Sequence, residues 1–244
     1  KRRRATGFAR AAFTAPMLIT GGAKRFGLRI ARKSVECGLD VILHYRSSKR
    51  EAESWLGRSP ASRKHVRFLQ GDLLDPSADI VGAASRLTRR LGGLVNSASV
   101  FTKGDLQDPA HLHSTLQINA LAPLQLADGF RRRAGRGWIV NITDAHIRPI
   151  SLTYQNYRIS KLLLTELTRQ MAVLYAPAIR VNAIAPGAIL PAAGASRRSF
   201  SRLAKGIPLK KTGDPAAVVK AFGYLLDNDY VTGETLYVDG GWHL

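Results

Sequence analysis

The chain has 244 residues, 45% of them hydrophobic, one cysteine and a formal net charge of +20. This length and composition predict a folded domain with a large core, and they exclude a disordered chain, an intramolecular disulfide and a zinc site built on cysteines. No apolar run reaches the 18 or so residues of a membrane helix, so we expect a soluble protein without membrane contact. The single cysteine fits a reducing, cytoplasmic setting. The positive charge favours anionic small-molecule ligands over nucleic acid, because no nucleic-acid-binding motif is present.

The elements alternate along the chain. Residues 1–16 are predicted to be a basic, disordered tail, with an organelle-targeting remnant as the alternative. Residues 17–244 are predicted to form one domain. In chain order the pattern predicts strand 17–20, helix 27–37, strand 40–45, helix 48–57, strand 65–69, helix 79–91, strand 93–96, helix 112–132, strand 138–142, helix 154–175, strand 179–184, a looser segment 186–213, helix 215–226 and strand 235–238.

The predicted strands are continuous apolar runs and not alternating ones. Strands of this kind are buried on both faces, and their alternation with helices is typical of parallel sheets. We therefore expect an α/β fold: a single Rossmann-type, doubly wound parallel sheet with helices on both faces.

A glycine-rich turn, TGGAKRFG at residues 20–27, lies between the first strand and the first helix. Glycines permit a tight turn and a close approach of the backbone to a pyrophosphate, which the helix N-terminus attracts. The placement of this turn predicts a dinucleotide-binding site.

The second strand ends in HYRSS at residues 44–48, where an NAD-binding protein usually carries an acid. His44, Arg46 and the hydroxyl groups beside them suit a 2′-phosphate, so we expect NADPH and not NADH. Asp72, in GDL after the third strand, is a candidate acceptor for the adenine amino group.

Tyr157 and Lys161 are four residues apart in YRISK, which places them on one face of a predicted helix. A tyrosine hydroxyl relays protons poorly at neutral pH unless its anion is stabilised. We expect Lys161 to lower the pKa of Tyr157 and to hold a ribose.

Together these motifs resemble those of the short-chain dehydrogenase/reductase family, over Met17 to Leu244. The resemblance rests on TGGAKRFG, GDL, NSAS, NALAP, YRISK, VNAIAPG and VTGETLYVDGG. It implies a single doubly wound domain that moves hydride between NAD(P) and its substrate, assembled as a homotetramer or dimer. It places Asn119, Tyr157 and Lys161 at catalytic positions.

The position thirteen residues before Tyr157 carries a serine in most members, but here it is Asp144. This resembles pteridine reductases, which use an Asp–Tyr–Lys set. Reduction of a C=N bond requires a proton on the ring nitrogen, which a carboxyl group is able to relay. The alternative is Thr143, whose hydroxyl would serve a carbonyl reductase acting, for example, on 3-oxoacyl thioesters.

Two further features resemble the same branch. Arg25 replaces a family glycine and is expected to reach the pyrophosphate and the pterin. Phe101 is expected to stack on the pterin. Ser99 is expected to form hydrogen bonds with the polar edge of the cofactor or the pterin. The segment 190–205 is interpreted as a substrate lid or a surface loop, in which Arg197 or Arg198 would meet an anionic substrate.

The expected function is NADPH-dependent reduction of a pterin of the dihydropteridine, dihydromonapterin or dihydrofolate type. A non-catalytic NADP sensor is the alternative from another class. The substrate site is expected to comprise Arg25, Ser99, Phe101, Asp144 and Tyr157, with no metal. The cofactor site is expected to comprise Thr20, Gly21, Lys24, Arg25, Gly27, His44, Tyr45, Arg46, Ser47, Asp72, Leu73, Asn96, Ser97, Ala98, Thr143, Tyr157, Lys161, Pro186, Gly187 and Ile189.

Overall fold

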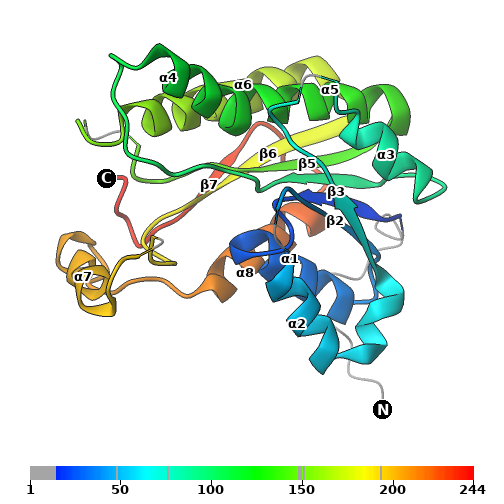
Figure 1. Ribbon diagram of the computed structural model, residues 1–244, viewed down its shortest axis with the longest axis horizontal. Helices are drawn as coiled ribbons and strands as arrows, with labels where there is room; N and C mark the ends of the chain where they lie inside the picture. Colours follow the sequence, from blue (N-terminus) through cyan, green and yellow to red (C-terminus); the bar gives the residue numbers. More distant parts are fainter. Residues whose placement is uncertain (1–14, 48, 76, 148–149, 151, 193) are drawn as a thin grey trace.

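A computed structural model describes residues 15–47, 49–75, 77–147, 150, 152–192 and 194–244 (Figure 1). Seven strands form one parallel sheet in the order β3-β2-β1-β4-β5-β6-β7. The order reverses between β1 and β4, so a crevice opens at the carboxyl ends of these two strands. The strands are β1 (Met17–Thr20), β2 (Val41–Tyr45), β3 (Val66–Gln70), β4 (Gly93–Asn96), β5 (Gly137–Ile142), β6 (Ile179–Pro186) and β7 (Thr235–Val238).

Helices cover both faces of the sheet, as expected (Figure 1). One face carries α1 (Arg25–Glu36), α2 (Arg50–Arg58) and α8 (Pro215–Asp227); the other carries α3 (Ile80–Arg86), α4 (Pro109–Leu116), α5 (Ala122–Ala134) and α6 (Gln155–Tyr175). Each face has its own apolar core. Ile30, Trp55 and Phe222 belong to the first core, and Val81, Phe130 and Met171 belong to the second.

The predicted fold class is confirmed, and the helix boundaries need correction. Helix α3 ends at Arg86 and not at residue 91, because the polar run Thr88–Arg90 stays at the surface and only Leu91 returns to the core at 2% exposure. Helix α4 begins earlier than predicted, at Pro109. The Asp108 carboxylate accepts a hydrogen bond from the His111 amide at 3.0 Å, which caps this first turn.

The predicted helix 112–132 is also not continuous. A π-helical segment, η3 (Gln117–Leu121), lies between α4 and α5. The insertion changes the direction of the side chains that follow it, and it carries Asn119 inward to 0% exposure.

The looser segment contains helical structure that the sequence pattern did not reveal. Helix α7 (Arg197–Arg202) continues into the 3₁₀ turn η4 (Leu203–Gly206), and the Ser196 hydroxyl caps it by accepting from the Ser199 amide at 3.1 Å. A second 3₁₀ turn, η2 (Pro60–His65), precedes β3. The tail residues 1–14 and Ser48 lie outside the described residues. In the described part of the chain, no helix combines the length and apolar character needed to cross a membrane.

Candidate active site

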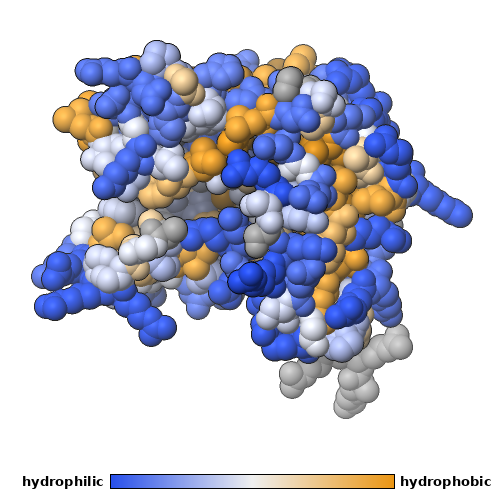
Figure 2. Space-filling model, in the orientation of Figure 1, coloured by the Kyte–Doolittle hydropathy of each residue, from blue (hydrophilic) through white to orange (hydrophobic). Residues whose placement is uncertain are grey.

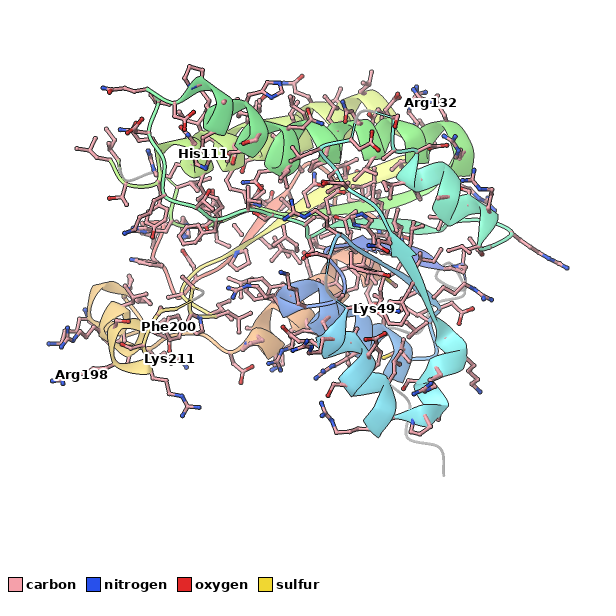
Figure 3. The ribbon with its side chains drawn as sticks, in the orientation of Figure 1. Lys49, His111, Arg132, Arg198, Phe200 and Lys211 are labelled. Atoms are coloured by element: carbon pink, nitrogen blue, oxygen red, sulfur yellow. The ribbon has the colours of Figure 1, made fainter. Side chains whose placement is uncertain are left out.

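The carboxyl ends of β1, β4, β5 and β6 meet at one end of the molecule, where most of the predicted site residues lie. Figure 2 shows a hollow in this end, between the side formed by α4 and the side formed by α7. In Figure 3, His111 of α4 and Phe200 of α7 lie on opposite sides of this end of the molecule.

A carboxyl group and a phenol meet at the start of α6. The Tyr157 hydroxyl donates a hydrogen bond to Asp144 Oδ2 at 2.6 Å, and the His146 amide donates to Asp144 Oδ1 at 2.7 Å. Tyr157 is only 9% exposed. The β5 strand ends just before Asp144, so the sheet edge and the helix together fix this pair.

Burial raises the pKa of the Asp144 carboxyl, although its hydrogen bond from Tyr157 opposes the rise. Burial also raises the pKa of Tyr157 well above its ordinary value, and the negative charge of Asp144 adds to this. A proton is therefore held between these two oxygens more firmly than either side chain would hold it in water.

Lys161 lies one helical turn from Tyr157, and its ammonium group is bound to the backbone of β5. Its Nζ donates to the carbonyl oxygen of Ile142 at 2.8 Å and lies 5.9 Å from the centre of the Tyr157 ring. Burial and Asp144 set the direction of the shift in the Tyr157 pKa, which is upward, so a lowering by Lys161 stays a prediction. Burial also lowers the pKa of Lys161 to about 8.

The competing hydroxyl, Thr143, is turned toward the neighbouring strand. Its Oγ1 donates to the carbonyl oxygen of Ile184 in β6 at 3.2 Å, and the residue is 3% exposed. The group that bonds to Tyr157 is thus a carboxyl and not a threonine hydroxyl.

Asn119 holds the loop that follows β4. Its Oδ1 accepts from the Val100 amide at 2.9 Å and from the Ser99 hydroxyl at 3.1 Å, and its Nδ2 donates to the Val100 carbonyl and to Ser160 Oγ, both at 3.0 Å. Its polar atoms are used in fixing the loop to α6. Asn119 is therefore a positioning residue here, and Ser99 remains exposed beside it.

Phe101 projects from this loop toward Tyr157 and is 48% exposed. One of its faces stacks on Tyr154 at 4.5 Å between ring centres, and Tyr157 meets it edge-on at 4.7 Å. Tyr154 was not singled out in the sequence. A hydrophobic aromatic immediately before the helix that carries YxxxK would have been the signal.

The glycine-rich turn forms a close-packed cradle at the start of α1. Gly21 has φ +60°, and a Cβ there would lie 2.8 Å from the Ala98 Cα. A Cβ on Gly27 would lie 2.7 Å from the Gly21 carbonyl oxygen. The exposed Lys24 adds a positive charge beside the free amides of α1. This cradle fits the phosphates of a dinucleotide.

Two side chains expected to contact the cofactor form hydrogen bonds with the protein backbone instead. Thr20 Oγ1 accepts from the amides of Ser97 and Ala98 at 3.1 and 3.2 Å, which ties β1 to β4. His44 is 2% exposed, its Nε2 bonds the Gly71 carbonyl at 3.1 Å, and burial lowers its pKa. A buried neutral imidazole does not supply charge to a 2′-phosphate, so this part of the prediction was wrong.

Arg46 and Ser47 remain exposed at the end of β2. Lys49, which the sequence did not single out, lies 5.9 Å from the centre of the Tyr45 ring, where its ammonium group pairs with Glu53 at 2.9 Å. Figure 3 shows Lys49 at the start of α2, beside this strand end. Arg46 is thus exposed at this strand end, and the charge of Lys49 beside it is shared with Glu53.

Other predicted cofactor residues shape the sheet edge. Asp72 accepts from the Leu74 amide at 3.0 Å, in a short turn that includes Leu73. Asn96 Nδ2 donates to Asn141 Oδ1 at 2.8 Å, whereas its own Oδ1 is buried without a partner among the described residues. The turn after β6 contains Pro186, Gly187 and Ile189, with the Gly187 amide donating to the Val238 carbonyl at 3.0 Å.

Arg25 links the glycine-rich turn to the segment 190–205. Its backbone has φ 51°, and its Nη1 donates to the Pro191 carbonyl at 3.1 Å. The positive charge of Arg25 opposes the rise in the Tyr157 pKa, which places this guanidinium within electrostatic reach of the phenol. Near the C-terminus, the Trp242 ring stacks on the His146 ring at 3.9 Å between ring centres. The sequence did not predict this contact.

Comparison with known proteins agrees with this architecture. A family model described as enoyl-(acyl carrier protein) reductase matches residues 21–243. An uncharacterised oxidoreductase of Mycobacterium tuberculosis is 32% identical over 92% of this chain and 90% of its own length. Dihydromonapterin reductase of an Enterobacter species is 30% identical over 93% of this chain and 95% of its own length.

A solved structure is similar over nearly the same span. The FolM alternative dihydrofolate reductase 1 from Brucella canis, complexed with NADP, superposes with a TM-score of 0.87 at 30% identity, and the match covers 96% of each chain. The resemblance seen in the motifs is thereby confirmed: the chain belongs to the short-chain dehydrogenase/reductase family of oxidoreductases.

Proposed function

We propose that this protein is an NADPH-dependent reductase that acts on the C=N bond of a dihydropterin, either a free pterin or a folate. The observation that carries the proposal is the 2.6 Å hydrogen bond from the Tyr157 hydroxyl to the Asp144 carboxylate, beside the half-exposed ring of Phe101. Relatives named dihydromonapterin reductase and alternative dihydrofolate reductase, one of them complexed with NADP, support the substrate class and the cofactor.

The residues of the nucleotide half fit NADPH. The cradle of Gly21 and Gly27 receives the pyrophosphate against the amides of α1, and Arg46 with Lys49 receives the 2′-phosphate. Lys161 is placed to exchange its bond to the Ile142 carbonyl for one to a ribose hydroxyl. When bound, the dihydronicotinamide supplies the hydride that reduces the C=N carbon.

The protein's own groups handle the proton. Because burial raises the pKa of Asp144, its carboxyl group retains a proton at a higher pH than an exposed aspartate does. Asp144 transfers this proton toward the ring nitrogen, and Tyr157, at hydrogen-bond distance, restores it. Phe101 stacks on Tyr154, and its half-exposed ring offers apolar surface to a flat heterocycle.

The test is NADPH oxidation measured side by side with dihydrobiopterin, dihydrofolate and an acetoacetyl thioester. We expect turnover of at least one pterin and little turnover of the thioester. Turnover of the thioester alone would assign the chain to the carbonyl reductases. NADPH binding without turnover of any substrate would instead favour the sensor.

A further inference from the structure

A cavity lined by arginines lies at the amino-terminal edge of the sheet, away from the candidate active site. It has a volume of about 370 Å³, within the range of roughly 300–1,000 Å³ typical of small-molecule sites. In Figure 3, Arg132 of α5 marks this end of the molecule, whereas Arg198 of α7 marks the opposite end. The lining consists of Gly82, Ser85, Arg86, Arg89, Arg90, Leu91, Arg133 and Ala134.

The lining contains four guanidinium groups and no carboxylate. Arg133 alone among them has an ion pair, to Asp79 at 2.7 Å. The side chains of Arg86, Arg89 and Arg90 have no ion pair within the described residues. The neighbouring acid, Asp128, is already shared by Arg131 and Arg132. Four like charges in one concavity repel one another unless an anion lies between them.

The backbone that carries these arginines is fixed. Asp79 caps α3 by accepting from the Gly82 amide at 2.9 Å, and the same carboxylate holds Arg133. Leu91, at 2% exposure, anchors the loop that carries Arg89 and Arg90. The backbone beneath the cavity is therefore positioned before any ligand arrives, and the exposed side chains of Arg86, Arg89 and Arg90 extend from it.

We propose that this cavity is a binding site for an oligophosphate, a ligand carrying at least two linked phosphate groups. One guanidinium group can donate two parallel hydrogen bonds to the oxygens of one phosphate. Several arginines in one cavity therefore suit a chain of linked phosphates better than a single monovalent anion. The site is separate from the NADPH cradle, and the proposal does not depend on the substrate of the reductase.

The test is calorimetric titration of the full chain with inorganic triphosphate, after saturation with NADP⁺ to block the phosphate-binding turn. We expect one saturable site, with affinity falling from triphosphate to pyrophosphate to orthophosphate. The triple variant Arg86→Gln, Arg89→Gln, Arg90→Gln should weaken triphosphate binding about tenfold or more. Repeating the titration with a nucleoside triphosphate distinguishes a nucleotide ligand from inorganic oligophosphate.

The control variant is Arg63→Gln, Lys64→Gln, Arg67→Gln, which removes the same charge from another exposed basic cluster. We expect it to bind triphosphate within about twofold of the unmodified protein, because screening weakens distant charges. Circular dichroism and NADPH turnover establish that both variants are folded. Equal weakening in the two variants, or no saturable binding to the unmodified protein, would overturn the proposal.

Discussion

The two halves of the candidate active site use different kinds of chemical groups. The nucleotide half, from Thr20 to Lys49, offers a glycine cradle, backbone amides and exposed cations, and its buried polar side chains serve the fold. The catalytic half, from Asn96 to Lys161, offers buried titratable side chains whose pKa values are displaced from normal. Recognition of a charged cofactor thus relies on shape and surface charge, whereas proton transfer requires desolvated groups.

The largest expected effect tests the catalytic half. Asp144→Ala removes the carboxyl that Tyr157 contacts, so pterin turnover should fall by roughly 10²- to 10⁴-fold. NADPH affinity, measured by fluorescence titration, should stay within about twofold, because Asp144 is not among the residues expected to hold the cofactor. Wild-type turnover in this variant would remove Asp144 from the mechanism. A comparable loss in Thr143→Val with full activity in Asp144→Ala would point to the threonine hydroxyl.

The pH dependence of turnover follows from the raised pKa of the Asp144 carboxyl. The donor form exists below that pKa, so kcat/KM should be highest on the acidic side. It should fall by about tenfold per pH unit once pH exceeds it. The midpoint should lie above the ordinary carboxyl range near 4. The measurement is steady-state NADPH oxidation across a pH series, and a rate that rises with pH would contradict the assignment.

The nucleotide half is tested by exchanging its charges. Arg46→Gln removes an exposed cation at the end of β2, and we expect the preference for NADPH over NADH to fall about tenfold. His44→Asn is the matched comparison at the same strand end. Since His44 is buried and neutral, this variant should lose thermal stability but keep the cofactor preference. The reverse pattern would restore His44 as the phosphate ligand.

The smallest expected effect concerns the aromatic face. Phe101→Leu keeps a hydrophobic side chain but removes the ring, and stacking contributes about 0.5–1.5 kcal/mol beyond the buried area. We expect KM for the pterin to rise by about two- to tenfold, with kcat for a saturating substrate little changed. Tyr154→Leu, which removes the support beneath Phe101, should have an effect in the same direction. Unchanged KM in both variants would separate the ring from substrate binding.

The sequence alone determined the fold class, the phosphate-binding turn and the set that contains Asp144 and Tyr157. Apolar periodicity, glycine positions and motif spacing are local properties of the chain, so they are readable without coordinates. The same local character explains why the type of each long element was predicted correctly while several ends were misplaced, as in α3.

Only the tertiary structure decided which polar groups are free. Thr20 and His44 have the right chemistry for a cofactor, but their partners Ser97 and Gly71, which directly follow β4 and β3, come from distant parts of the sequence. Likewise, the effect of Lys161 on Tyr157 depends on burial and on the carboxyl of Asp144, which no spacing along the helix reveals. Hydrogen-bond satisfaction and desolvation are properties of the packed molecule, because they depend on every neighbour that folding brings close.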